Sequence, residues 1–203
     1  QNRSWNQGNS GIKIKRLKLT DSLKTMIFVL TGPVHSGKTC FLKCLVTQLK
    51  LAGLSLSGYL SEPIMADGQN EGYNLCDLNS GRLVPFLRKS GYSSPETDRA
   101  GQFHFLPSGL EMARDIIISA GATDLLIIDE DGPAEIRGEG VWPYLHPVLD
   151  KTTCLLVIRE QLLPDFINLL PLPVMLFKPG EQGEETEYIL NMIRVVRLKK
   201  LAD

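Results

Sequence analysis

The sequence lacks several features that would place it in a special class of protein. No apolar run approaches the roughly 20 residues that a membrane-spanning helix needs. The formal net charge of -1 leaves no overall field to attract nucleic acid or an acidic membrane surface. The N-terminal segment is polar and has no apolar core of the secretory kind. These absences predict a cytoplasmic protein with no membrane partner and no expected nucleic-acid partner.

Cysteine is scarce, and its spacing does not favour a metal site. The four cysteines stand at positions 40, 44, 76 and 154 and form no CxxC pair. Cys40 and Cys44 would share one face of a helix, but a metal there would need two more ligands, such as His104 and His146. Buried, reduced cysteines behave as small apolar residues, and we expect these to be of that kind.

The length of 203 residues suits one domain with a core of its own, preceded by an N-terminal segment. Residues 1–11 are rich in Asn, Ser, Gly and Gln and predict a flexible arm. Apolar and basic residues nearly alternate from Ile12 to Leu19, which favours an edge strand over the alternative of a nucleic-acid-binding arm. We therefore divide the chain into an arm or edge strand, residues 1–24, and a domain, residues 25–203.

From Met26 onward, short apolar runs alternate with helical patterns. Continuous apolar runs separated by helices are typical of a parallel sheet covered on both faces. The candidate strands are Met26 to Leu30, Leu56 to Ile64, Leu125 to Asp129, Cys154 to Ile158 and Val174 to Phe177. One stretch predicts an antiparallel hairpin instead, with strands Tyr73 to Leu78 and Leu83 to Leu87 around Asn79-Ser80-Gly81. The fold class is therefore α/β, a mainly parallel sheet with helices on both faces and an added hairpin.

Five segments have helical patterns. Ser108 is a plausible N-cap, because Glu111 stands three residues later as in a capping box. The last segment has acidic residues at its start and lysines at its end, which complements the helix dipole. The five segments are Lys38 to Ala52, Ser108 to Ala120, Gly138 to Leu149, Glu160 to Leu170 and Glu184 to Leu201.

A phosphate-binding motif follows the first apolar strand. Residues 32–39 match GxxxxGK[ST], the Walker A pattern, in which glycines let successive backbone N–H groups point at phosphate. The helix that follows directs its free N–H groups at the same anion. We expect Lys38 to reach the β- and γ-phosphates and Thr39 to ligate Mg²⁺, with a passive role for His35. The expected nucleotide-binding residues are Gly32, Pro33, Val34, His35, Ser36, Gly37, Lys38, Thr39 and Cys40.

A second motif, of the Walker B type, ends the strand Leu125 to Asp129. Four apolar residues deliver Asp129 and then Glu130 to the carboxyl end of a strand, where open α/β sheets bind ligands. We expect Asp129 to hold Mg²⁺ and Glu130 to orient or deprotonate the attacking water. The structural alternatives are a helix cap for Asp129 and a solvated loop acid for Glu130.

With these motifs in place, the chain resembles the small thermophilic-type nucleoside-triphosphatase family over roughly Met26 to Leu198. The most specific match is the stretch that begins with Ile127 and ends with Glu135, which is similar to that family's Asp-Glu-x-Gly-x-x-Glu signature. The other matching segments are Thr31 to Thr39, Gly58-Tyr59-Leu60-Ser61-Glu62, where the family has Thr before the Glu, Glu71-Gly72-Tyr73 and Gly101-Gln102-Phe103.

The resemblance implies a P-loop NTPase domain that slowly hydrolyses ATP, GTP and other triphosphates with Mg²⁺. It also implies that the strand ending at Ile158 lies between the phosphate-loop strand and the aspartate strand. Arg159 would then emerge near the γ-phosphate and act with Lys38 and Glu130, although a surface arginine is the alternative. No protein partner is indicated.

The chain departs from the family pattern in three places, which leave nucleotide binding intact and bear on the hydrolysis rate and on a substrate or partner contact. Pro63 and Ile64 stand where the family usually has a hydrophobic residue and an arginine. Asn70 and Glu71 replace another arginine, and Asp131 replaces an apolar residue.

Two other functions fit the same phosphate loop. A small-molecule or nucleotide kinase would usually carry an arginine-bearing lid, and the long segment 89–101 holds Arg99 alone. A nucleotide-dependent switch of the GTPase kind would typically carry an Asn-Lys-x-Asp motif, and the sequence has none. Hydrolysis is therefore the favoured function.

Overall fold

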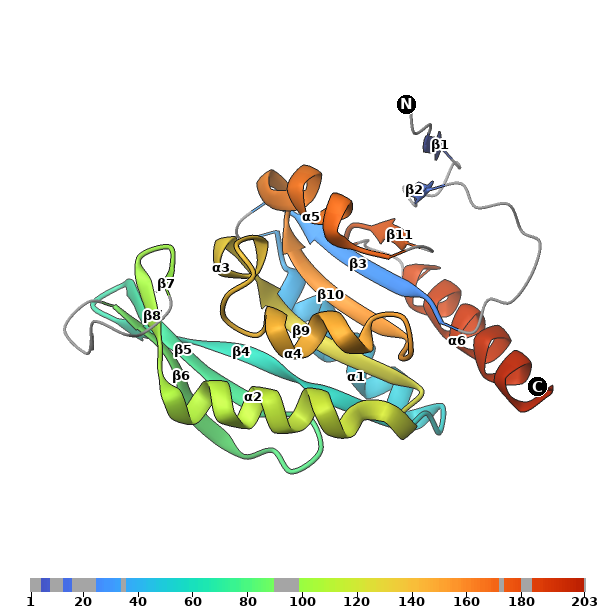
Figure 1. Ribbon diagram of the computed structural model, residues 1–203, viewed down its shortest axis with the longest axis horizontal. Helices are drawn as coiled ribbons and strands as arrows, with labels where there is room; N and C mark the ends of the chain where they lie inside the picture. The colour runs from blue at the N-terminus through green and yellow to red at the C-terminus, as the bar shows by residue number, and fades with distance from the viewer. Residues whose placement is uncertain are drawn as a thin grey trace.

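A single mixed β-sheet runs through the molecule and carries helices on both faces (Figure 1). The computed structural model describes residues 5–7, 13–15, 25–33, 36–89, 99–171, 174–179 and 184–202. Within these residues the sheet has eleven strands in the order β1-β2-β11-β3-β10-β9-β4-β5-β6-β8-β7. The α/β fold class predicted from the sequence is confirmed.

The five central strands are parallel and are the five that the apolar runs predict. In sheet order they are β11 (Val174–Phe177), β3 (Ile27–Gly32), β10 (Cys154–Arg159), β9 (Leu125–Asp131) and β4 (Leu56–Ala66). Neighbouring residues such as Phe28 and Val29 point to opposite faces, and both are fully buried. Helices therefore cover both faces, as continuous apolar strands require.

An antiparallel wing extends the sheet beyond β4. It consists of β5 (Gln69–Asp77), β6 (Leu83–Lys89), β8 (Phe103–Phe105) and β7 (Arg99–Ala100). The pairing of β5 with β6 confirms the predicted hairpin. β4 also turns back into β5 through Asp67 and Gly68, which both have positive φ. The wing is thus larger than the hairpin that the sequence predicts.

The N-terminal strands lie at the other side of the sheet. β2 (Lys13–Lys15) pairs antiparallel with β11, and β1 (Trp5–Gln7) pairs with the outer side of β2. Trp5–Gln7 falls in the segment that we expected to be a flexible arm. The division of the chain at residue 24 stays a prediction.

Two groups of helices enclose two apolar cores, one on each face. α1 (Lys38–Leu51) and α6 (Glu184–Ala202) pack on one face, where Leu45 and Ile193 join the same cluster. α2 (Pro107–Ser119), α4 (Trp142–Leu145) and α5 (Leu163–Leu169) pack on the other, with Ile117 and Phe166 in the second cluster. The remaining short helices are α3 (Pro133–Ile136), η1 (Ala120–Ala122), η2 (His146–Val148) and η3 (Glu160–Leu162).

Two helix predictions need correction. The capping box at Ser108 is wrong, because α2 begins with Pro107 after the extended residue Leu106, and the Ser108 hydroxyl donates to Pro85 O at 3.4 Å. Proline suits the first helical position, where its missing N–H costs nothing. The predicted helix from Gly138 to Leu149 is reduced to α4 and η2, because Gly138 and Gly140 have φ values of 80° and 62°.

Among the described residues, no helix combines the length and the apolar character that a bilayer crossing requires.

Candidate active site

The phosphate-binding motif connects β3 to α1 and begins at the carboxyl edge of the sheet. Gly32 ends β3, and a Cβ at this position would lie 2.8 Å from the Ser36 hydroxyl oxygen. Gly37 precedes α1 with φ 81° and ψ 12°, in the left-handed region that favours glycine. The backbone conformation thus favours glycine at position 37, and glycine at position 32 leaves room for the Ser36 side chain. Val34 and His35 lie outside the described residues.

The start of α1 has the character of an anion site. Among the described residues, no side chain caps this end of the helix, and no acidic residue stands in its first turn. The N–H groups of the first turn have no intrahelical acceptor, and the helix dipole adds positive charge there. The Lys38 ammonium folds over the loop and donates to Gly32 O at 3.0 Å and Pro33 O at 2.7 Å. The loop therefore gathers backbone and side-chain donors at one point.

Three neighbouring strands bring the predicted catalytic residues to this edge. β10 lies between β3 and β9, as the resemblance implied. Arg159 pairs with Gly32 across β10 and β3, while Ile158 pairs with Asp131 across β10 and β9. Carboxyl ends of parallel strands form the ligand-binding crevice of open α/β sheets. The fold thus places Arg159 between the phosphate loop and the acidic segment, residues 129–131.

The ladder between β9 and β10 is irregular at the two acids. Ile128 pairs with Leu156 and Asp131 pairs with Ile158, so Asp129 and Glu130 together face the single residue Val157. Such β-bulges re-aim side chains and are common next to active sites. The structure describes the backbone of Glu130 and Asp131 and not their side chains, so the base assigned to Glu130 stays a prediction.

Asp129 is buried and held by a residue that sequence reasoning missed. The Ser61 N–H donates to Asp129 Oδ2 and the Ser61 hydroxyl donates to Asp129 O, each at 3.0 Å. Asp129 and Ser61 are only 4% and 3% exposed. The available signal was the position of Ser61 in the strand that resembles the family, but nothing in the sequence linked it to Asp129.

The sheet face on which Asp129 lies is the face covered by α1. Leu125 and Ile127, which precede Asp129 at intervals of two, belong to the core cluster that contains the α1 side chains. Thr39 lies in the first turn of α1. The two residues predicted to bind Mg²⁺ therefore come from elements packed on one another.

An ion pair lies beside this face. Lys43, one helical turn after Thr39, donates to Glu62 Oε1 at 2.9 Å. The hydrogen bond to Glu62, and more weakly the charge of Asp129, hold the pKa of Lys43 above its usual value. Lys43 was not predicted as a site residue.

The cysteine expectation is wrong for two of the four residues. Cys40 and Cys44 are exposed, because α1 buries the face that carries Leu42, Leu45 and Leu49. Among the described side chains, no group of three or more His, Cys, Asp or Glu could hold a metal. A magnesium site built from one aspartate, one hydroxyl and substrate oxygens would not form such a group.

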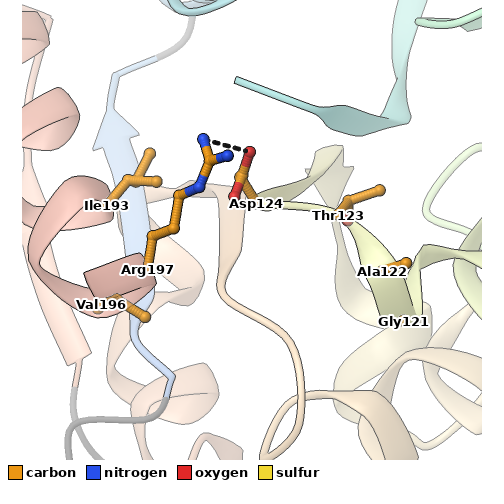
Figure 2. A pocket seen from close by; sticks show the side chains of 7 residues that line it. All are labelled: Gly121, Ala122, Thr123, Asp124, Ile193, Val196 and Arg197. Carbon is orange, nitrogen blue, oxygen red and sulfur yellow. Dashed lines mark ion pairs between the residues drawn. The ribbon is translucent and has the colours of Figure 1, made fainter. Parts of the chain in front are cut away.

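A pocket of about 260 Å³ lies away from these residues (Figure 2). It lies at the amino end of β9, between η1 and α6, and Arg197 Nη1 approaches Asp124 Oδ2 there at 3.6 Å. The same Asp124 oxygen accepts hydrogen bonds from the Ser55 N–H and hydroxyl, both at 2.9 Å. We assign the active site to the opposite, carboxyl edge, because the phosphate loop and the acidic segment meet there.

Comparison with known proteins identifies the family of the chain. Residues 27–172 match the family model described as NTPase. The chain is 28% identical to nucleoside-triphosphatase THEP1 of Hyperthermus butylicus over 141 residues, which are 68% of this chain and 74% of the relative. It is also 28% identical to THEP1 of Thermoplasma volcanium, over 75% of this chain and 97% of the relative.

Solved structures show the same fold at lower identity. THEP1 from Aquifex aeolicus superposes with a TM-score of 0.63 at 20% identity, covering 83% of this chain and 99% of the other. A human cancer-related nucleoside triphosphatase superposes with a TM-score of 0.60 at 22% identity, covering 84% and 96%. The family model spans most of the chain and includes the phosphate loop, the acidic segment and Arg159. The chain therefore belongs to the NTPase family and is a nucleoside-triphosphate phosphohydrolase.

Proposed function

We propose that this enzyme is a magnesium-dependent nucleoside triphosphatase of the cytoplasm that converts ATP, GTP and other triphosphates to diphosphate and phosphate. The observation that carries the proposal is the meeting of β3, β10 and β9 at one edge. There Gly32, Arg159 and the acidic segment lie on adjacent strands.

The donor set at the phosphate loop fits a triphosphate. The Ser36 hydroxyl oxygen is buried and has no hydrogen-bond partner within the described residues. A Cβ on Gly32, the first residue of the loop, would lie close to this oxygen. A buried hydroxyl left unpaired costs free energy, and a phosphate oxygen would supply its acceptor. Together with the uncapped end of α1, this supports phosphate binding at residues 32–40.

The residues at the metal position fit magnesium. Thr39 offers a hydroxyl and Asp129 a carboxylate, and both are hard oxygen ligands of the kind Mg²⁺ prefers. Bound magnesium would neutralise negative charge on the β- and γ-phosphate oxygens. Ser61 holds Asp129 in place for this role through two hydrogen bonds.

Each remaining residue has a part in hydrolysis. Lys38 leaves the carbonyls of Gly32 and Pro33 to bind the β- and γ-phosphates. Glu130 orients the attacking water and accepts its proton, and Arg159 stabilises the charge that develops on the transferred phosphoryl group. The products are a nucleoside diphosphate and inorganic phosphate, with no second substrate.

The test is phosphate release from ATP, GTP, CTP and UTP in one assay, with Mg²⁺ and with excess EDTA. We expect release from all four with catalytic efficiencies within a hundredfold of one another, because backbone N–H contacts to phosphate carry no information about the base. EDTA should abolish release. A preference above a hundredfold for one base would indicate a loop that recognises the base, and residues 178–183 would be the first candidate. Release only with an added acceptor would identify a kinase, and fewer than one turnover per hour would identify a switch.

The hydroxyl of Ser61 provides a test of the metal assignment. Ser61→Ala removes the hydrogen bond to Asp129 O, and one lost hydrogen bond is worth about 0.5–1.5 kcal/mol. We therefore expect the Mg²⁺ concentration for half-maximal activity to rise roughly threefold to tenfold. Ser61→Thr, which keeps the hydroxyl, serves as the control and should stay close to the parent. Equal Mg²⁺ dependence in the alanine variant and the parent would contradict Asp129 as a ligand held by Ser61.

A further inference from the structure

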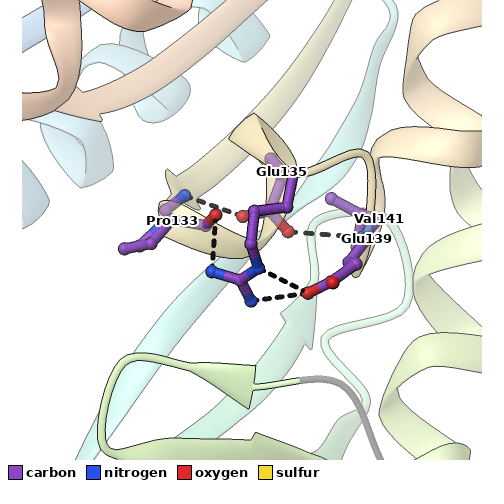
Figure 3. Close-up of polar contacts among 6 residues, drawn as sticks. Pro133, Glu135, Glu139 and Val141 are labelled. Carbon is purple, nitrogen blue, oxygen red and sulfur yellow. Dashed lines mark hydrogen bonds and ion pairs between the residues drawn. The ribbon is translucent and has the colours of Figure 1, made fainter.

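Glu135 is a buried carboxylate for which the mechanism above has no use. It is 2% exposed and belongs to α3, the single helical turn that follows β9. Both of its oxygens accept backbone hydrogen bonds. Oε2 accepts from the Gly132 N–H at 2.8 Å and Oε1 from the Val141 N–H at 3.3 Å (Figure 3). The side chain thus joins the two ends of the segment 132–141.

The segment 132–141 is shaped around this carboxylate. A Cβ on Gly140, which has φ 62°, would lie 2.3 Å from Glu135 Oε1 and 3.0 Å from the Phe105 ring. On the outside of the segment, Arg137 donates to Pro133 O at 3.0 Å and to Glu139 Oε2 at 2.9 Å. Glycine at position 140 therefore lets the backbone close tightly on Glu135.

The segment that Glu135 holds, residues 132–141, starts directly after the acidic residues at the end of β9. β4 pairs with β9 only as far as Ile128, and the ladder with β10 is interrupted opposite Asp129 and Glu130. Ser61 fixes the start of this irregular stretch. Its end is fixed by the pair Asp131–Ile158 and by the bond from the Gly132 N–H to Glu135.

Burying this acid opposes its ionised form. Burial raises the pKa of Glu135 to about 7, although the two N–H donors favour the carboxylate. A buried charge of this kind is weak evidence of a role in stability, because apolar residues often replace such groups without loss. Its geometry suits a different role, since two backbone bonds from one rigid side chain fix a loop next to an active site.

We propose that Glu135 is a positioning residue for hydrolysis. By binding Gly132 and Val141 it fixes the backbone that leaves the acidic segment, and so sets the placement of Asp129 and Glu130 relative to the phosphate loop. The inference rests on the proposed function of those acids. Glu135 itself touches neither substrate nor metal in this scheme.

The test compares turnover with nucleotide affinity in Glu135→Gln. The amide has the size of the acid but one acceptor oxygen, so it can satisfy only one of the two N–H groups. Small displacements of catalytic groups can cost up to about a hundredfold in rate, and we expect kcat to fall roughly tenfold to a hundredfold. The Kd for ATP, measured by calorimetry without Mg²⁺, should change less than twofold, because the phosphate loop lies on another strand. The Mg²⁺ concentration for half-maximal activity should rise.

The matched control is Glu139→Gln, which changes an acid of the same segment whose carboxylate bonds only Arg137 in the described structure. It should keep the parent kcat. Parental kcat in Glu135→Gln, or a parallel loss of kcat and affinity, would overturn the proposal. If Glu135→Gln does not fold by circular dichroism, Glu135→Asp is measured instead. If neither folds, the carboxylate serves the fold alone and the proposal is wrong. A parent that releases no phosphate would refute the proposed function, whereas an active parent matched by Glu135→Gln would refute only the role of Glu135.

Discussion

Replacing Glu130 with Gln is expected to lower turnover by roughly 10²–10⁴, the usual contribution of a positioned general base. The amide keeps the size and hydrogen-bonding capacity of the side chain but cannot accept the proton of the attacking water. Binding of nucleotide and Mg²⁺ should survive, because Lys38, Thr39 and Asp129 are the residues expected to make those contacts. Single-turnover phosphate release and calorimetric ATP binding measure the two effects separately.

Two further variants make the assignment of the base specific. Asp129→Asn should weaken Mg²⁺ dependence and nucleotide binding together, since Asp129 is expected to hold the metal. Asp131→Asn should have little effect if Glu130 is the base. Asp131 is still the natural alternative, because it directly follows Glu130, at the point where β9 pairs regularly again with Ile158 of β10. Parental hydrolysis by Glu130→Gln together with an inactive Asp131→Asn would transfer the role to Asp131.

Lys38→Ala should lower ATP affinity at least tenfold with little effect on folding. Truncating one partner of a buried charge contact typically costs about 2–5 kcal/mol. The hydrogen bonds that the structure describes for this ammonium go to the Gly32 and Pro33 carbonyls of the loop, and the side chain belongs to neither apolar core. Calorimetry measures the affinity, and thermal unfolding measures the stability of the free protein.

Lys50→Ala is the matched control for Lys38. Lys50 lies at the other end of α1 and donates to Leu78 O at 2.6 Å, far along the helix from the phosphate loop. We expect its replacement to leave ATP affinity unchanged. If both lysine variants bound ATP like the parent, the loop would not be the phosphate site.

The sequence predicted the central fold because its signals there are local. The five apolar runs lie largely in buried positions, and burial on both faces of a parallel sheet favours apolar residues. The phosphate loop is also predictable from local sequence, since its motif is contiguous and the backbone at Gly37 has a positive φ that favours glycine. The position of β10 between β3 and β9 came from the family resemblance, because no local signal specifies the order of parallel strands.

Other features of the site depend on residues far apart in the sequence. Ser61 and Asp129 meet only because β4 lies beside β9, and the bulge at Asp129 and Glu130 is a property of two paired strands. The exposure of Cys40 and Cys44 depends on which face of α1 packs against α6. At α2, the N-cap is Leu106 and the helix begins with Pro107, two residues before the capping pattern predicted.

The pairing of β3 with β10 also has a consequence for the order of folding. Ile27 pairs with Cys154 and Gly32 with Arg159, so this contact closes a loop that contains most of the chain. The hairpins β4–β5 and β5–β6 close short loops instead. Contacts of low sequence separation form early and non-local pairings form late, because loop closure must precede them. The phosphate loop therefore reaches its final position in the sheet only when β3 pairs with β10. A chain still being synthesised cannot complete its nucleotide site until β10 has left the ribosome.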